Sequence, residues 1–300
     1  MQEYRIDQFD IYILRILAKN CRASYRSIGL ALGITTNTVK NRIRNLINNK
    51  ILSRYVLHIN FAVIGYKNNC LLIVHNNTSP DAIIGKLSSL GKVYLHVDCL
   101  GDMSVFGIVF KKKFDELELT LSRVIRPAIL RNVFRGDLES RYVNLSPIDL
   151  KIIKSLLGDP RMKNEDIAKA NSVSQKTIKR RLELMRKNHV LDFGIVYNPS
   201  AMKGYIYFGL IVQTESYQCQ RVLEEVYVKF YSLLLRHPQT VHKDVIVLNL
   251  YSRNICDLDS ILKTAKSIEG VTKAEIFQTV KTEILDKWIY QDIDEMLLLK

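Results

Sequence analysis

The sequence contains an internal duplication, and this feature restricts the possible folds more than any other. Shifting the 300-residue chain by 139 positions aligns residues 10–66 with residues 149–205 without a gap. The matched positions include Asp10/Asp149, Ile28/Ile167, Thr38/Thr177, Lys40/Lys179, Arg42/Arg181, Leu52/Leu191 and Gly65-Tyr66/Gly204-Tyr205. Because a repeated segment folds into a repeated unit, we expect the chain to contain the same structure twice.

Each copy contains a segment with the pattern of an amphipathic helix. The first, GITTNTVKNRIRNL (residues 33–46), places Val39, Ile43 and Leu46 on one face at spacings of four and three. Thr35 follows a Gly-Ile pair and is suited to cap this helix. The second segment, SVSQKTIKRRLELM (residues 172–185), repeats the stripe with Ile178, Leu182 and Met185. This pattern is typical of the second helix of a helix-turn-helix.

Start signals predict two further helices before each amphipathic one. In the first copy Asp7 is suited to cap a helix, and Ser24 opens another at YRSIGLALG. In the second copy Ser146 precedes Pro147 at the first helical position, with Asp149 three residues after the cap. An alternating segment, 52–61 or 191–200, follows each amphipathic helix and predicts a strand leading to the next domain.

The segments after these strands have the order β-α-β-β-α-β, which predicts a four-stranded antiparallel sheet with two helices on one face. The expected elements are 68–76, 81–90, 92–101, 102–112, 114–125 and 129–138 in the first copy, and 205–214, 217–230, 232–241, 243–252, 256–268 and 273–284 in the second. The fold class is therefore α+β, with two winged helix-turn-helix domains alternating with two ferredoxin-like sandwiches. The expected domains are 1–64, 65–141, 142–203 and 204–283, followed by an amphipathic tail at 284–300.

The positive charge is concentrated in the two helix-turn-helix candidates. The chain has a net charge of +14. Residues 1–66 hold ten Lys and Arg against three Asp and Glu, and residues 143–205 hold twelve against six. The sandwiches are nearly neutral, with +3 for residues 67–142 and −2 for residues 206–300. Since neutralised phosphates release counterions, double-stranded DNA is the expected partner of these basic segments.

Composition argues against membrane and secreted classes. No apolar run reaches the roughly eighteen residues of a membrane span, and MQEYRIDQFD is too polar for a secretory signal. A cytoplasmic location is expected. The five cysteines have no zinc-ligand spacing and are expected to be reduced thiols. We expect neither a cofactor nor a metal.

The polar faces of the amphipathic helices supply the candidate DNA-binding residues. Short side chains near the start of such a helix reach base edges, and longer basic ones further along bind phosphates. The candidates are Thr35, Thr36, Asn37, Lys40, Asn41 and Arg44 in the first copy, and Ser174, Gln175, Lys176, Lys179 and Arg180 in the second. Glu183 replaces Arg44 in the second copy and would repel a phosphate.

Other polar residues are expected to be structural. Arg42 and Arg181 lie at the edge of the apolar stripe and are suited to pair with Asp10 and Asp149. His75 and His96 are expected on neighbouring strands of the first sheet, where a metal or catalytic role is the less favoured alternative. The tail places Trp288, Ile289, Ile293, Met296 and Leu297 on one side. Docking of this side on the chain's own sandwich is the simpler expectation, and a contact between chains is the alternative.

The sequence resembles the Lrp/AsnC (feast/famine) family of transcription regulators, twice along the chain. The resemblance rests on IDQFDIYIL and LSPIDLKII at the starts of the copies, on VKNRIRNLINNKIL and IKRRLELMRKNHVL, on the Gly-Tyr pair before each sandwich and on IEGVTKAE. It implies amino-acid effectors bound near a Gly-Asp hairpin between sandwiches. Gly101 and Asp102 match that hairpin, whereas the second copy reads VHKDVIV there. The effector of this chain is left open.

Three functions remain open at this point. The first is a sequence-specific regulator that is not an enzyme. The second is an enzyme similar to siroheme decarboxylases, which resemble this fold, although their anionic substrate would favour basic sandwiches. The third is an architectural DNA-binding protein with little sequence preference. The uncovered sheet faces predict either a homo-oligomer or a pseudo-dimer within one chain.

Overall fold

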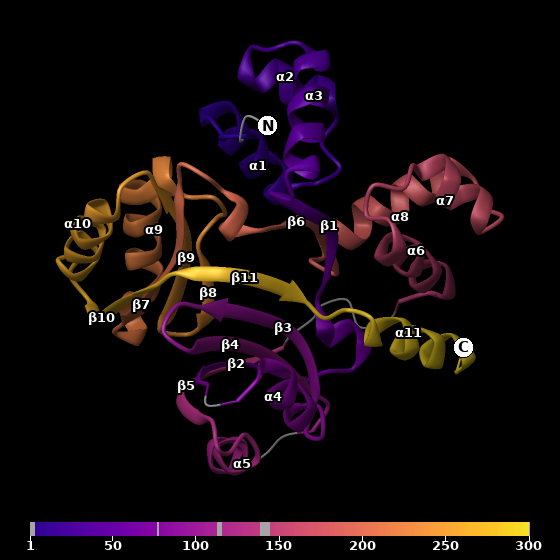
Figure 1. Cartoon of the computed structure of the whole chain (residues 1–300). Coiled ribbons are helices and arrows are strands. Elements are labelled where there is room, and N and C mark those ends of the chain that lie inside the picture. Colours follow the sequence, from indigo (N-terminus) through magenta and orange to yellow (C-terminus); the bar gives the residue numbers. More distant parts are fainter. Residues whose placement is uncertain (1–3, 77, 113–115, 139–144, 300) are drawn as a thin grey trace.

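A computed structural model describes residues 4–76, 78–112, 116–138 and 145–299 (Figure 1). The first half contains α1 (Gln8–Lys19), α2 (Tyr25–Leu32), α3 (Thr36–Asn48), β1 (Leu52–Ile59), β2 (Asn68–His75), α4 (Pro80–Leu87), β3 (Lys92–Cys99), β4 (Met103–Phe110), α5 (Leu117–Val124) and β5 (Ile129–Asp137). The second half contains α6 (Pro147–Gly158), α7 (Asn164–Ala170), α8 (Gln175–Lys187), β6 (Leu191–Tyr197), β7 (Ile206–Thr214), α9 (Cys219–Phe230), β8 (Gln239–His242), β9 (Val245–Ser252), α10 (Ile255–Lys266), β10 (Val271–Phe277), β11 (Thr279–Ile284) and α11 (Trp288–Leu298).

The two three-helix units form as the duplication predicts. We call α1–α3 head 1 and α6–α8 head 2. The predicted caps are confirmed. Asp7 and Ser146 each form a reciprocal capping box at the start of a first helix, and Ser24 caps α2. The apolar stripes of α3 and α8 are buried, which leaves their polar faces exposed.

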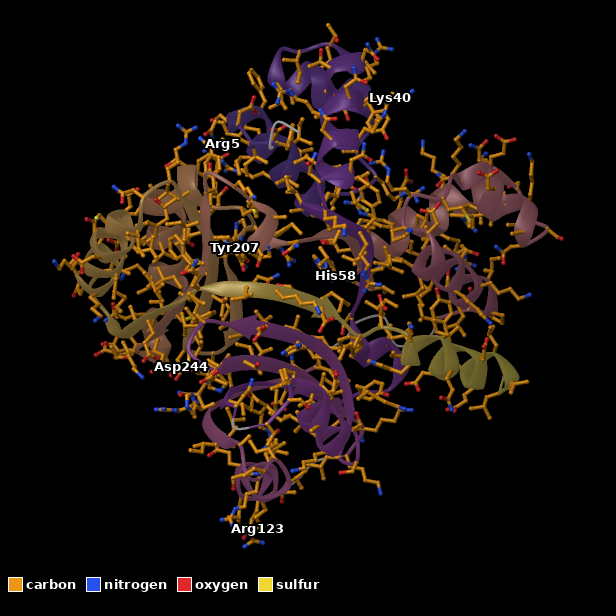
Figure 2. All side chains as sticks on the ribbon, in the orientation of Figure 1. Arg5, Lys40, His58, Arg123, Tyr207 and Asp244 are labelled. Carbon is orange, nitrogen blue, oxygen red and sulfur yellow. The ribbon has the colours of Figure 1, made fainter. Side chains whose placement is uncertain are left out.

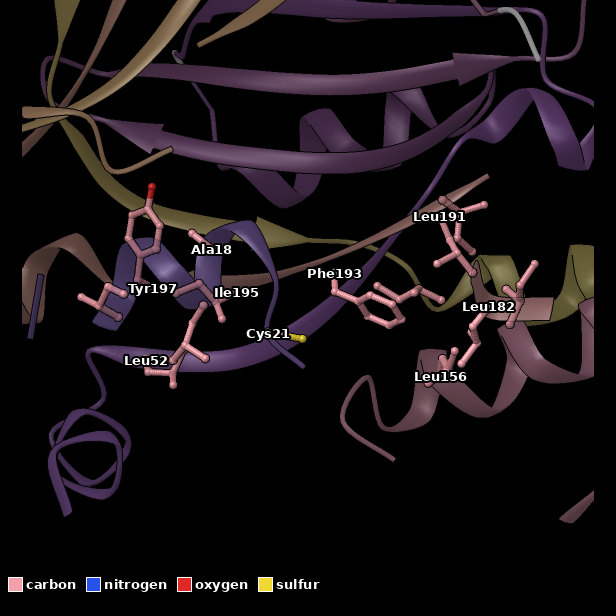
Figure 3. Packing of buried hydrophobic residues seen from close by; sticks show 14 of the residues in the cluster. Ala18, Cys21, Leu52, Leu156, Leu182, Leu191, Phe193, Ile195 and Tyr197 are labelled. Atoms are coloured by element: carbon pink, nitrogen blue, oxygen red, sulfur yellow. The ribbon is translucent and has the colours of Figure 1, made fainter. Parts of the chain in front are cut away.

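The strands that leave the heads pair with each other. β1 and β6 form a two-stranded antiparallel ribbon between the heads, with Tyr55 opposite Ile195. Figure 3 shows Phe193 and Ile195 of this ribbon packed with residues of both heads, including Cys21 and Leu156. One apolar core therefore runs from head 1 through the ribbon to head 2, and the heads are packed rather than loosely tethered.

Each ferredoxin-like sandwich is present. The first sheet has the order β11-β3-β4-β2-β5 and the second has the order β10-β7-β9-β8. Helices α4 and α5 cover the outer face of the first sheet, and α9 and α10 cover the outer face of the second. The expectation that His75 and His96 lie on neighbouring strands was wrong, because β4 lies between β2 and β3. His96 instead packs against Phe106 and contacts Glu283 at 3.1 Å.

The inner faces of the two sheets pack against each other within the chain. Ile73 and Phe134 of the first sheet contact Ile211 and Val245 of the second in one buried cluster. The predicted last strand of the second copy is divided into β10 and β11. β10 pairs with β7, and β11 crosses to the edge of the first sheet beside β3 (Figure 1). The chain is therefore an intramolecular pseudo-dimer with helices outside and two sheets inside.

One predicted strand is largely wrong. The sequence predicts a strand over residues 232–241, but only β8 forms there. Leu234 pairs with Leu250, and Gln239 pairs with Val247. An advance of five residues along this segment therefore lies opposite an advance of three residues along β9. Pro238 has no N–H group for the sheet, and the extra residues form a bulge that contains Arg236.

The C-terminal helix docks on its own chain. In α11, Ile289 and Ile293 are buried, and the indole N–H of Trp288 donates to the carbonyl of Val93 at 3.0 Å. The Asp292 carboxylate accepts a hydrogen bond from the Tyr66 hydroxyl at 2.7 Å. The predicted amphipathic side therefore docks on its own chain, at the edge of the first sandwich and on α6 of head 2, where Lys154 also forms an ion pair with Asp294.

The ribbon contains a histidine that should make stability depend on pH. His58 of β1 has a buried Nε2, and burial, together with the charges of Arg236 and Arg54, lowers its pKa to about 3. An unfolded histidine has a pKa near 6.5, so the folded state resists protonation. The contribution of neutral His58 to the free energy of unfolding is therefore fully present above about pH 6.5 and is lost as the pH falls toward 3.

Between pH 7.5 and 5.5 we expect the free energy of unfolding of the wild type to fall by about 1 kcal/mol more than that of the His58→Gln variant. Urea denaturation of both proteins at both pH values measures it. Because all other titrating groups are shared, the difference between the two losses isolates His58. Equal losses in the wild type and the variant would contradict the prediction.

Candidate nucleic-acid interface

The outward face of α3 presents the polar residues that the sequence predicts. Thr36, Asn37, Lys40, Asn41 and Arg44 are all exposed. Figure 2 shows Lys40 pointing away from the body of head 1. Among the described residues, Lys40 and Arg44 have no hydrogen-bond or ion-pair partner. Their charges are therefore uncompensated and free to meet an anion.

Thr35 begins this helix by capping it. Its hydroxyl oxygen accepts a hydrogen bond from the backbone N–H of Thr38 at 3.1 Å. Gly33 ends α2 in the left-handed conformation with φ of 67°, which gives the sharp turn between the two helices. Gly29 of α2 packs so closely on this turn that an added Cβ would lie 2.6 Å from the carbonyl oxygen of Ile34. The turn thus fixes α3 against α2.

The outward face of α8 has the same layout with different chemistry. Gln175, Lys176, Lys179 and Arg180 are exposed, and Ser174 caps the helix through the N–H of Thr177 at 3.1 Å. Among the described residues, Lys176 and Arg180 are without a partner. The Nζ of Lys179 lies 4.0 Å from Glu183, so part of its charge is compensated. Compared with the face of α3, the face of α8 carries more positive charge at its N-terminal end and less at its C-terminal end.

The interpretation of Arg42 and Arg181 as structural ion-pair residues is confirmed. Arg42 of α3 contacts the buried carboxylate of Asp10 at 3.0 Å. Arg181 of α8 contacts the buried carboxylate of Asp149 at 3.5 Å. Each pair joins the first helix of a head to its outward-facing helix. These arginines therefore orient α3 and α8 and are not part of the exposed faces.

Sequence reasoning missed two arginines that join the heads. Arg22 of head 1 donates to the carbonyls of Pro160 and Met162 at 2.9 and 2.8 Å. Arg161 of head 2 donates to the carbonyl of Ala23 at 3.5 Å and lies 5.0 Å above the ring of Tyr55. Arg22 and Arg161 are 139 positions apart, so they are equivalent in the duplication. Their reciprocal contacts fix one head against the other. The signal in the sequence that could have revealed them was an arginine at both matched positions of the duplication.

The candidate effector residues lie at a surface turn. Gly101 and Asp102 are exposed between β3 and β4, with φ values of 78° and 55° that suit a tight hairpin turn. The backbone carbonyl of Asp102 accepts from the N–H of Asn76 at 2.6 Å. This hydrogen bond ties the turn to the residue that follows β2. Whether the turn binds an effector stays a prediction.

The described ranges contain neither a cluster of candidate metal ligands nor a helix of membrane-spanning character. No group of three or more His, Cys, Asp or Glu side chains is placed there to hold a metal ion. None of the helices formed by these residues has the length and apolar character needed to cross a membrane. The cysteines are free, with Cys256 exposed and Cys21, Cys70, Cys99 and Cys219 buried.

Comparison with known proteins agrees with this geometry. The family model of the AsnC-type helix-turn-helix domain matches residues 6–47 and 145–186, which coincide with the two heads. The HTH-type transcriptional regulator Ptr1 of Methanocaldococcus jannaschii is 30% identical over 125 residues, covering 41% of this chain and 84% of that protein. The HTH-type transcriptional regulator FL11 of Pyrococcus abyssi is 26% identical over 141 residues, covering 47% and 92%. Each relative therefore corresponds to one repeat.

The tandem arrangement also has a counterpart among solved structures. The siroheme decarboxylase NirDL in complex with an iron-uroporphyrin III analogue has a TM-score of 0.52 and 13% identity, covering 98% of this chain and 99% of that one. At this identity the likeness concerns the fold alone. Two matched heads, two sandwiches and the two single-repeat relatives lead to one conclusion. The chain belongs to the Lrp/AsnC family, as a tandem duplication of its helix-turn-helix and αβ-sandwich unit.

Proposed function

We propose that the chain is a transcriptional regulator that binds a specific DNA sequence through two non-identical heads. The observation that carries the proposal is the pair of exposed helix faces with cations that have no partner among the described residues. The two relatives named as HTH-type transcriptional regulators support it. In this proposal domains 1–64 and 142–203 bind DNA, and domains 65–141 and 204–283, with the tail 284–300, hold them in place.

The proposed contacts follow from side-chain length and position. In head 1, Thr36, Asn37 and Asn41 are short enough to reach base edges, while Lys40 and Arg44 can reach bases or phosphates. In head 2, Gln175, Lys176, Lys179 and Arg180 take the matching positions. Thr35 and Ser174 use their hydroxyls as caps and would contact DNA only at the helix start.

Both heads belong to one chain, and we propose that no second chain is needed to bring them together. The β1–β6 ribbon and the reciprocal contacts of Arg22 and Arg161 already hold the heads as a pair. The inner sheet faces are covered by each other, so they are not available to a second copy.

The first test of the proposal is the salt dependence of DNA binding. We expect Lys40→Ala and Lys179→Ala each to weaken binding, because each removes a cation from a polyanion interface. A single phosphate contact contributes about 0.9 to the slope of log affinity against log salt concentration. We therefore expect each slope to become shallower, at most by about that amount, in fluorescence anisotropy titrations on duplex DNA.

Lys266→Ala is the matched control, because Lys266 is an exposed lysine of α10 with no partner among the described residues. It should change neither the affinity nor the slope. Unchanged binding in both Lys40→Ala and Lys179→Ala would overturn the assignment of α3 and α8 as the DNA-binding helices.

Sequence specificity is a separate part of the proposal. An architectural protein would bind genomic fragments with similar affinities, whereas a regulator typically binds its own site about 10³-fold or more tightly than other DNA. The ratio of specific to non-specific affinity, measured at one salt concentration, distinguishes the two. A ratio near one would favour the architectural role.

The enzymatic alternative is less well supported. A siroheme-like substrate carries many carboxylates on a large ring, and the sandwiches that would bind it are nearly neutral. The cavity between the sheets is about 160 Å³, close to the size that holds one benzene molecule. We therefore propose that the chain is not a tetrapyrrole enzyme. An absorption shift of iron-uroporphyrin on mixing with the protein would argue against this.

A further inference from the structure

A cavity of about 160 Å³ lies between the two sheets, where the ribbon joins them. Ile73 and Phe134 of the first sheet and Val247 of the second form part of its apolar wall. The ribbon contributes His58 and Tyr197. Figure 2 places His58 at the centre of the molecule, near the arrowhead that ends β11. An apolar cavity of this size holds a molecule with about six carbon atoms.

Three polar groups on one side of this cavity satisfy each other. The Tyr197 hydroxyl donates to the Tyr207 hydroxyl at 2.8 Å, and the Tyr207 hydroxyl donates to the amide oxygen of Asn249. Burial raises the pKa of both tyrosines, so they remain neutral donors. Both tyrosine hydroxyl protons are donated within this chain of hydrogen bonds, which leaves little donor capacity for a ligand.

One basic group on the cavity wall is not satisfied. The Arg236 guanidinium, half-buried in the bulge before β8, has no hydrogen bond or ion pair with any residue that the structure describes. His58 also lines the cavity, but its Nε2 is fully buried against Gly194, where an added Cβ would lie 2.7 Å from it. A partly buried charge without a partner is unfavourable. A carboxylate in the cavity would satisfy Arg236.

The wall carries no opposite charge. No Asp or Glu is found among the described residues that line the cavity. Arg236 also lies close enough to His58 for its charge to contribute to the low pKa of that ring. The cavity therefore combines an apolar body with one uncompensated positive end. It offers nothing to neutralise an ammonium group.

We propose that this cavity binds a small aliphatic carboxylate that lacks an amino group. The carboxylate pairs with the Arg236 guanidinium, whose planar fork matches a carboxylate in a bidentate contact. The hydrocarbon body packs against Ile73, Phe134 and Val247. The site is separate from the Gly101-Asp102 turn. It also does not depend on the proposed DNA-binding function, because Arg236 lies at the cavity between the sheets and not on α3 or α8.

Three molecules of the same carbon skeleton test the proposal by isothermal titration calorimetry on the full chain without DNA. The probes are 4-methylpentanoate, its uncharged amide 4-methylpentanamide, and L-leucine, which adds an ammonium group to the first. We expect 4-methylpentanoate to bind with a dissociation constant of about 1 mM or lower, within the range for so small a ligand. The amide and L-leucine should bind at least about tenfold more weakly.

Arg236→Gln should weaken binding of 4-methylpentanoate at least about tenfold, to the level of the amide. Its matched control is Arg123→Gln, because Arg123 is exposed on α5, at the far end of the molecule from His58 in Figure 2. Arg236 is half-buried in a bulge, so its loss should leave the thermal midpoint of unfolding nearly unchanged. No binding of 4-methylpentanoate to the wild type, equal binding to Arg236→Gln, or equal or tighter binding of L-leucine would each overturn the proposal.

Discussion

Replacing Asp10 with alanine is expected to destabilise head 1 by about 3 kcal/mol. The Asp10 carboxylate is buried and accepts three hydrogen bonds, from the Tyr4 hydroxyl at 2.8 Å, from the backbone N–H of Asp7 at 3.1 Å and from Arg42 at 3.0 Å. Alanine removes all three acceptor contacts. Removing one partner of a buried ion pair costs about 3–5 kcal/mol. We expect the low end, because Arg42 is partly exposed and keeps its contact with Asp7.

The equivalent change in head 2, Asp149→Ala, should have a smaller effect, about 1–2 kcal/mol. Asp149 is equally buried, but its contact with Arg181 is longer, at 3.5 Å, and its Oδ1 has no partner. Removing this carboxylate also removes an unsatisfied buried oxygen, which offsets part of the loss. The duplication thus supplies a matched pair of variants that differ in the quality of one ion pair.

Hydrogen exchange measured by mass spectrometry can resolve the two heads, because each head gives its own peptides. A loss of 3 kcal/mol should speed exchange in α1 and α3 roughly a hundredfold. Asp10→Asn, which keeps the size of the side chain, should fall between the wild type and alanine. A loss in Asp149→Ala as large as that in Asp10→Ala would contradict the prediction.

The local structure of the heads could be predicted because its causes are local. A cap such as Asp7 or Ser146 satisfies N–H groups within three residues, and the stripe of Val39, Ile43 and Leu46 repeats with the period of one helix. The partners of Arg42 and Arg181 could be predicted as well, because the duplication carried each basic residue together with its acid. Those features need no knowledge of how the domains meet.

The cavity could not be predicted, because it depends on contacts between distant segments. Its basic residue Arg236 lies in a segment where the alternating pattern predicts an uninterrupted strand. The bulge before β8 places Arg236 at the cavity, and His58 reaches it only because β1 pairs with β6. The crossing of β11 to the first sheet also needs the two sheets to face each other. These facts belong to the assembled pseudo-dimer and not to any one repeat.

The largest effect on recognition is expected where the two heads differ. The duplication aligns Asn37 with Lys176 and Asn41 with Arg180. An asparagine amide suits adenine N6 and N7, whereas lysine and arginine suit guanine O6 and N7. We therefore expect an asymmetric DNA site, A·T-rich under head 1 and containing guanine under head 2. A bidentate contact discriminates against a wrong base by about 1–3 kcal/mol.

Selection of bound sequences from a random DNA pool measures this preference for the wild type, Asn37→Ala and Arg180→Ala. Each alanine variant should relax base preference in one half of the site and leave the other half unchanged, because each head reads its own half.

The double variant Asn37→Lys with Asn41→Arg gives head 1 two of the reading residues of head 2, Lys176 and Arg180. Both faces already share a lysine at the matched positions Lys40 and Lys179. The selected site should therefore gain guanine in its first half and become more symmetric. This gain separates a reading role from simple loss of affinity, which any damage to head 1 would also cause. If both alanine variants relax the same positions, or the double variant leaves the site unchanged, then only one head reads DNA and the other acts as a scaffold.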